Sequence, residues 1–127
     1  MKIMIIDDEP DVLDYLTVVL EDNGFDTCTL EEDEPVDEAI QSYSPDLIIL
    51  DIMMPRRSGV SIYKELRSTP DFKTIPIAII SGMMPEKDFK KSFQNLVNDN
   101  TISLPDGFIE KPIQLKGLLE LIQKLLN

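Results

Sequence analysis

The chain has 127 residues, 43% of them hydrophobic, which is enough for one folded domain with a core. Twelve basic residues against twenty-four acidic ones give a net charge of −12, which disfavours nucleic acid and anionic membranes as direct ligands. The chain has no histidine, which excludes histidine-ligated metals and a Ser-His-Asp triad.

Two further features indicate a cytoplasmic protein. The one cysteine, Cys28, cannot form an internal disulfide, which fits a reducing compartment. The apolar run at the start of the chain is too short for a signal peptide, and no stretch approaches the roughly 20 apolar residues that span a bilayer.

Strand and helix patterns alternate along the whole chain. Aliphatic runs predict the strands and helical spacing of apolar residues predicts the helices. In chain order they are strand 2–6, helix 10–23, strand 25–30, helix 34–43, strand 47–50, helix 58–68, strand 75–80, a helix containing Phe89, Phe93, Leu96 and Val97, strand 107–110 and helix 115–126.

Local signals support several of these boundaries. Pro10 suits a first helical turn and Gly24 suits a left-handed helix stop. Asp33 can cap the next helix, with Pro35 inside its first turn. The strand at 47–50 is apolar on both faces, as a central parallel strand should be.

The alternation predicts an α/β domain of the (βα)₅ type, a parallel five-stranded sheet with helices on both faces. With no internal repeat or linker visible, we expect a single domain over residues 1–127 without an attached output domain.

Polar residues stand where four of the predicted strands end. Asp7 and Asp8 follow the first strand and Asp51 the third, while Ser81 follows the fourth and Lys111 the fifth. In open α/β sheets, ligands bind beyond the carboxyl ends of the strands. Three carboxylates, a hydroxyl and an ammonium group would suit a divalent cation and a phosphoryl group there. Without histidine in the chain, a phosphoryl group would have to come from another molecule.

Each of these signals also has a simpler interpretation. The acidic run of Asp7, Asp8 and Glu9 before Pro10 could stabilise a helix N-terminus electrostatically. Asp51 could begin a loop, Ser81–Gly82 could be an ordinary turn, and Lys111–Pro112 could be a turn with a solvated lysine. It is improbable that all four coincide at strand ends without a shared function.

The ordered set of motifs resembles the receiver domains of two-component response regulators, over essentially the whole chain. It consists of Asp7-Asp8, residues 51–59 (the pattern D-x-x-M-P-x-x-x-G), Ser81-Gly82 and residues 108–112. The resemblance implies a flavodoxin-like, doubly wound sheet of order 2-1-3-4-5. It also implies phosphorylation of Asp51 by a sensor histidine kinase or histidine phosphotransfer protein, followed by a conformational switch that acts on a downstream protein or output domain.

The resemblance further implies a Mg²⁺ site. Asp8, Asp51 and the backbone carbonyl of Met53 would touch the ion, and Asp7 would act mainly through water. The residue types agree with this expectation, because Mg²⁺ prefers oxygen ligands and clustered carboxylates repel each other without a cation.

Other roles are implied in the same way. Lys111 would pair with the acceptor carboxylate and then with phosphoryl oxygens, and its bond to Pro112 would be cis. Ser81 would hydrogen-bond the phosphoryl group in the active state. Phe108 stands at the aromatic switch position, although it could equally be a core aromatic residue.

Two features of this chain go beyond the shared motifs, and the second is a departure from the family pattern. Met53 and Met83 stand where relatives tune acyl-phosphate hydrolysis, and apolar side chains would position a water poorly, which predicts a long-lived phosphoaspartate. The segment at about 98–106 is an extended loop between the fourth helix and the fifth strand, and Ile102 and Leu104 would pin it to the body.

Three other functions are alternatives to a phosphorylated signalling module. A pseudo-receiver, binding proteins without phosphorylation, would be favoured by loss of Asp51, Lys111 or the acidic pair, and none is lost. A Mg²⁺-dependent aspartyl phosphatase would need a D-x-D signature and a cap segment, whereas the aspartates here are adjacent and the chain is too short for a cap. A flavodoxin would need a phosphate loop of Ser, Thr and Gly where this chain has carboxylates. We expect a receiver that assists its own phosphorylation and dephosphorylation but is not a conventional enzyme.

Overall fold

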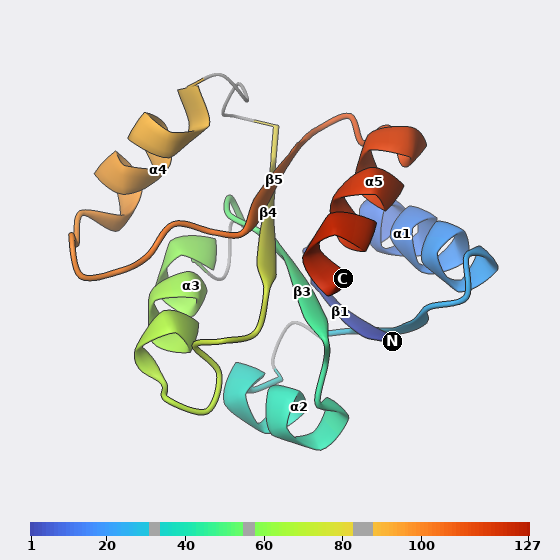
Figure 1. Ribbon diagram of the computed structural model, residues 1–127, viewed down its shortest axis with the longest axis horizontal. Coiled ribbons are helices and arrows are strands. Elements are labelled where there is room, and N and C mark those ends of the chain that lie inside the picture. Colours follow the sequence, from blue (N-terminus) through green and yellow to red (C-terminus); the bar gives the residue numbers. More distant parts are fainter. Residues whose placement is uncertain (31–33, 55–57, 83–87) are drawn as a thin grey trace.

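The computed structural model describes residues 1–30, 34–54, 58–82 and 88–127, in which strands and helices alternate (Figure 1). In chain order the elements are β1 (Lys2–Ile6), α1 (Pro10–Asp22), β2 (Asp26–Thr29), α2 (Val36–Tyr43), β3 (Leu47–Asp51), α3 (Gly59–Ser68), β4 (Ile77–Ser81), α4 (Phe89–Val97), β5 (Gly107–Glu110) and α5 (Leu115–Leu126). The strands form one parallel sheet of order β2-β1-β3-β4-β5. The predicted doubly wound fold is confirmed.

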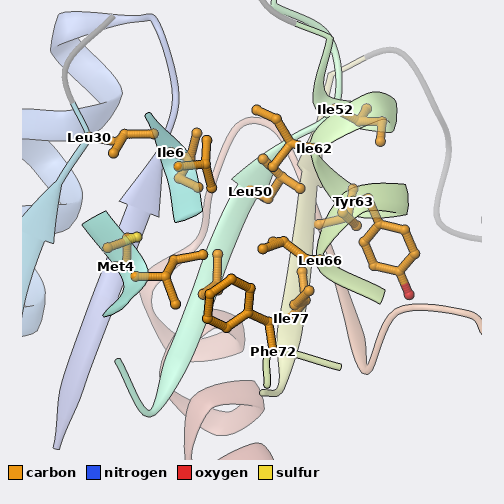
Figure 2. Packing of buried hydrophobic residues seen from close by; sticks show 14 of the residues in the cluster. Met4, Ile6, Leu30, Leu50, Ile52, Ile62, Tyr63, Leu66, Phe72 and Ile77 are labelled. Carbon is orange, nitrogen blue, oxygen red and sulfur yellow. The ribbon is translucent and has the colours of Figure 1, made fainter. Parts of the chain in front are cut away.

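The sheet has a hydrophobic core on each face. Along β3, Ile48 and Leu50 point to one cluster while Leu47 and Ile49 point to the other, because successive strand side chains alternate. Helices α2, α3 and α4 cover the first face and α1 and α5 cover the second (Figure 1). Figure 2 shows the first cluster, where Leu50 of β3 packs beside Ile62 and Leu66 of α3.

Two strands, β3 and β4, extend one residue further than predicted, whereas β2 is one residue shorter at each end than the predicted 25–30 and β4 begins later. Asp51 pairs with Ile80, and Ser81 pairs with Glu110, so both polar residues are the last of their strands rather than the first of a loop. The prediction that β4 begins at residue 75 is wrong, since the strand begins at Ile77. Pro76, which has no N–H to donate to the ladder, precedes it.

The helix boundaries follow from local backbone geometry. Gly24 has a φ of 89°, which confirms its predicted left-handed stop after α1. Pro35 is the N-cap of α2, not part of its first turn, because its ψ of 130° is extended. Asp33, the predicted cap, lies outside the described residues.

Residues 98–106 connect α4 to β5 and lie against the body of the domain. Ile102 and Leu104 are half-buried on the cluster that α2, α3 and α4 cover, as the sequence predicted. The buried Tyr63 of α3 donates a hydrogen bond from its hydroxyl to the carbonyl of Ser103, at 2.7 Å. Apolar and polar contacts together therefore hold this segment.

A buried arginine anchors the end of the same segment. The Arg67 side chain is only 5% exposed, and its guanidinium lies 2.6 Å from Asp106 Oδ2. It also donates to the carbonyls of Lys73 and Ile75, at 3.0 and 2.8 Å. The same Asp106 oxygen accepts from the Ile77 N–H, so the network fixes the amino ends of β4 and β5. A planar five-donor group suits such a junction.

The first residue of α3 lies directly against the end of β3. A Cβ atom added to Gly59 would lie 2.6 Å from Ile52 Cα and still closer to the carbonyl oxygen of Asp51. Because both neighbours are backbone atoms, neither can move aside without displacing the strand end. Glycine at this position thus allows α3 to approach the residue that ends β3.

We predict that Gly59→Ala lowers the free energy of unfolding by about 1–3 kcal/mol, the usual cost of overpacking. Gly117→Ala is the matched control, since nothing lies within 4 Å of a Cβ added there in α5. That control should be neutral or stabilising by up to about 1 kcal/mol. Urea denaturation followed by circular dichroism measures both changes, and equal stability of the two variants would contradict the prediction.

Candidate functional site

Most of the candidate polar residues lie together at the carboxyl edge of the sheet. Asp7 comes directly after β1, Asp51 ends β3, Ser81 ends β4 and Lys111 comes directly after β5. Asp7, Asp51 and Ser81 are 4%, 2% and 0% exposed. Charged residues are seldom buried unless they are paired or bind a ligand, so this edge is the strongest site candidate in the described chain.

Three carboxylates crowd into this edge. Asp7, Asp8 and Asp51 each place one oxygen within 4.8 Å of the other two. Local N–H groups hold two of them in place: Glu9 N–H donates to Asp7 Oδ1 at 2.9 Å and Met53 N–H donates to Asp51 Oδ1 at 3.0 Å. The second oxygens of Asp7 and Asp51 lie 3.2 and 3.5 Å from the ammonium of Lys111.

One oxygen of this group lacks a hydrogen-bond donor. Asp7 Oδ2 is buried, and no described residue donates a well-aligned hydrogen bond to it, although Lys111 Nζ lies 3.2 Å away. A buried anionic oxygen without a donor is unfavourable. A divalent cation with oxygen ligands would satisfy it, so the donor set fits Mg²⁺.

Lys111 is the positive charge of the site. Its ammonium lies 2.5 Å from Glu9 Oε1, 3.2 Å from Asp7 Oδ2 and 3.5 Å from Asp51 Oδ2. Burial acts to lower the pKa of Lys111, but the pairs with Glu9, Asp51 and Asp7 outweigh it and raise the pKa above its usual value. The lysine is therefore a fixed cation at this edge.

The environment of Asp51 disfavours the charged form of its side chain, whereas that of Lys111 favours the charged form. Burial, with a further contribution from the negative charge of Asp7, raises the pKa of Asp51 to about 6. The Met53 N–H and the Lys111 ammonium act in the other direction and offset only part of the increase. The charged form of Asp51 is thus less favourable here than in water, and a bound cation would offset this cost.

The other candidates lie on β4, on β5 and directly after β5. The carbonyl of Ser81 accepts from the Lys111 N–H at 3.0 Å, which joins the ends of β4 and β5. The Lys111–Pro112 peptide bond is cis. Phe108 is half-buried and stacks on Phe89 of α4, with ring centroids 4.1 Å apart. The resemblance did not suggest this partner on α4.

Of the two methionines predicted to affect hydrolysis of the phosphoaspartate, the structure describes only one. Met53 is 48% exposed beside Asp51, while Met83 lies outside the described residues.

Sequence reasoning missed one residue of the site. Glu9, which the sequence suggested only as helix-terminal charge, makes the shortest contact to Lys111. Its position directly after the acidic pair was the one available signal.

No helix in the described part of the chain is both long and apolar enough to cross a membrane.

We predict a pH-dependent gain in stability for Asp51→Asn in the metal-free protein. Because the folded-state pKa of about 6 exceeds the ordinary value of 3.8, the folded state binds the proton more tightly than the unfolded state. Stability therefore falls as pH rises from about 4 through about 6. Asp51→Asn removes this penalty, so it should be more stable than wild type near pH 7.5, with an advantage that shrinks toward pH 5.

Urea denaturation with a chelator present, at several pH values, measures that difference. Asp14→Asn is the control, since it removes one exposed negative charge from α1. Added Mg²⁺ should stabilise wild type more than Asp51→Asn, because the variant lacks one ligand. A stability difference independent of both pH and Mg²⁺ would show that the carboxylates do not repel each other as the geometry indicates.

Comparisons with known proteins agree with this arrangement. The family model of the response regulator receiver domain matches residues 3–123. The chain is 26% identical over 126 residues to the DNA-binding response regulator MtrA of Mycolicibacterium smegmatis, covering 99% of the chain and 50% of MtrA. It is equally similar to the phosphate regulon transcriptional regulatory protein PhoB of Escherichia coli, covering 99% of the chain and 52% of PhoB. The chain thus spans about half the length of these curated relatives.

A solved structure shows the same architecture at similar identity. The signal receiver domain of a signal transduction histidine kinase from Syntrophus aciditrophicus superposes with a TM-score of 0.79 and 27% identity, covering 98% of this chain and 89% of that domain. Similar domains therefore occur in regulators and in kinases.

Proposed function

We propose a function from one premise: the chain belongs to the family of response regulator receiver domains, whose model matches residues 3–123. In this proposal Asp51 accepts a phosphoryl group from a histidine kinase or a histidine phosphotransfer protein in two-component signalling, in a reaction that requires Mg²⁺. Phosphorylation then changes the conformation and the binding of a downstream protein or output domain.

One observation carries the proposal. A buried carboxylate, Asp51, lies within 3.5 Å of a lysine ammonium and shares a 4.8 Å cluster with two further carboxylates. Phosphoryl transfer needs mainly alignment and neutralisation of negative charge, and these are the groups that can supply both. The cytoplasm is part of the proposal, since it suits the free Cys28.

The residues that would hold Mg²⁺ are Asp7, Asp8, Asp51 and the backbone carbonyl of Met53. The donorless Asp7 Oδ2 supports this set. When bound, the ion would neutralise charge on the phosphoryl oxygens of the donor. Asp8 is the exposed member of the cluster, which leaves one side of the site open to solvent and to a donor.

The chain's own side chains would perform the remaining steps. An Asp51 carboxylate oxygen attacks phosphorus, and the phosphorus–nitrogen bond of the donor phosphohistidine breaks, with its electron pair returning to the imidazole. Lys111 holds positive charge beside the new phosphoryl oxygens. The Ser81 hydroxyl would donate to one of them, and Phe108 would respond as the switch. The domain assists this reaction but does not act on an external substrate as a conventional enzyme.

The alternative is a pseudo-receiver that binds proteins without phosphorylation. The complete set of acceptor, lysine and acidic pair argues against it. DNA is not a ligand in this proposal, because a net charge of −12 opposes binding to a polyanion.

Chemical phosphorylation separates the two functions. We expect acetyl phosphate with Mg²⁺ to add one phosphoryl group to wild type, as measured by intact mass, and to add none to Asp51→Asn. A chelator should abolish labelling, while Asp14→Asn should label like wild type. Absence of labelling in wild type that is folded by circular dichroism would favour the pseudo-receiver.

We also predict a slowly hydrolysed phosphoaspartate. Met53 offers no hydrogen bond to an attacking water, so Met53→Asn should shorten the lifetime by about two- to tenfold, the contribution of one hydrogen bond. Intact mass followed over time after removal of acetyl phosphate gives both lifetimes. Rapid loss of the label from wild type would contradict the prediction.

A further inference from the structure

The ammonium of Lys111 lies nearer to Glu9 than to the proposed acceptor. The two distances are 2.5 Å to Glu9 Oε1 and 3.5 Å to Asp51 Oδ2. Glu9 is the N-cap residue of α1, but its side chain makes no capping hydrogen bond. Its carboxylate instead reaches a lysine 102 positions away in the sequence. This contact therefore belongs to the site rather than to the helix.

Two of the three ammonium donors of Lys111 are already used, by Glu9 and by Asp51. The ammonium also lies 3.2 Å from Asp7 Oδ2, without a well-aligned hydrogen bond. A phosphoryl group arriving on Asp51 would compete with these carboxylates for the lysine. Glu9 is the easiest to displace, because its side chain is 57% exposed whereas those of Asp7 and Asp51 are buried. An ion pair with an exposed partner is weak, and the released carboxylate regains water.

The acidic charge around the site makes the pairing of Glu9 with Lys111 more consequential. Residues 1–51 contain sixteen of the twenty-four acidic residues but one of the twelve basic residues. Donors of phosphoryl groups are anions, so a donor approaching the ends of β1 and β3 meets the clustered carboxylates of Asp7, Asp8 and Asp51. Lys111 is the cation that the described structure places beside Asp51, and Glu9 partly neutralises it.

We propose that Glu9 is a positioning residue that competes with the phosphoryl group for Lys111: it holds the ammonium in the unphosphorylated state and releases it when Asp51 is phosphorylated. This inference rests on the proposed function of Asp51. Glu9 restrains phosphorylation in this scheme, and its carboxylate at the start of α1 is free only in the phosphorylated state.

Three variants of α1 test the competition. Glu9→Gln removes the charge, Glu9→Asp keeps the charge but shortens the reach, and Asp11→Asn removes an exposed charge two residues away. The initial rate of labelling by acetyl phosphate is measured at saturating Mg²⁺ over a range of donor concentrations. We expect Glu9→Gln to raise the maximal rate by about two- to fivefold, the range for a pair with one exposed partner. Glu9→Asp should change the rate in the same direction, and Asp11→Asn should leave the maximal rate unchanged.

Removing the lysine supplies a second test. In a Lys111→Met background, Glu9→Gln should no longer raise the maximal rate, because no ammonium remains to be shared. If Glu9 acted only by repelling the donor, Glu9→Asp would behave like wild type, and Glu9→Gln would lower the half-saturating donor concentration in both backgrounds. That pattern would overturn the inference.

A readout without labelling completes the design. Glu9→Gln should lower the free energy of unfolding of the unphosphorylated protein by losing the pair with Lys111. The same substitution should have no effect when Mg²⁺ and saturating beryllofluoride, an analogue of the phosphoryl group, occupy the site. An equal effect in both states would show that Glu9 keeps Lys111 and would overturn the exchange. Failure of acetyl phosphate to label any variant, wild type included, would instead count against the proposed function of Asp51.

Discussion

The site depends on holding two buried carboxylates close together against their mutual repulsion. Asp7 and Asp51 lie at the ends of β1 and β3, which are neighbours in the sheet. Hydrophobic packing on both faces fixes these strands, so the carboxylates cannot separate without disrupting the core. Lys111 compensates only part of this charge. The remaining imbalance is what makes the edge suited to a cation and to a phosphoryl group.

Contacts at both ends of the strands maintain this geometry. At the carboxyl edge, α3 begins against the backbone of Asp51, which is possible only because residue 59 is glycine. At the amino ends of β4 and β5, the buried guanidinium of Arg67 joins Asp106 to the body of the domain. The strands that end in Ser81 and lead to Lys111 are thereby anchored at the side opposite the site.

A row of aromatic rings links the site edge to α4. Phe108 of β5 stacks on Phe89, Phe89 contacts Phe93 at 5.4 Å between centroids, and Phe93 meets Tyr63 edge-on at 4.9 Å. Tyr63 in turn binds the carbonyl of Ser103. Movement of Phe108 would therefore change the packing of α4 and of the segment at 98–106. These contacts connect the aromatic switch position to the side of the domain that α4 covers.

Periodicity and local boundary signals determined the alternating elements and placed those with predicted bounds within about two residues of the observed ones, because burial of one face depends on local spacing. It also identified the polar residues at strand ends, since parallel strands bring their carboxyl ends to one edge. The sheet order was implied by family resemblance and not by spacing. Only the tertiary structure revealed the pairs of Glu9 with Lys111, Arg67 with Asp106 and Phe89 with Phe108. Such pairs join residues far apart in the sequence, and their contact depends on how helices and strands pack rather than on any local pattern.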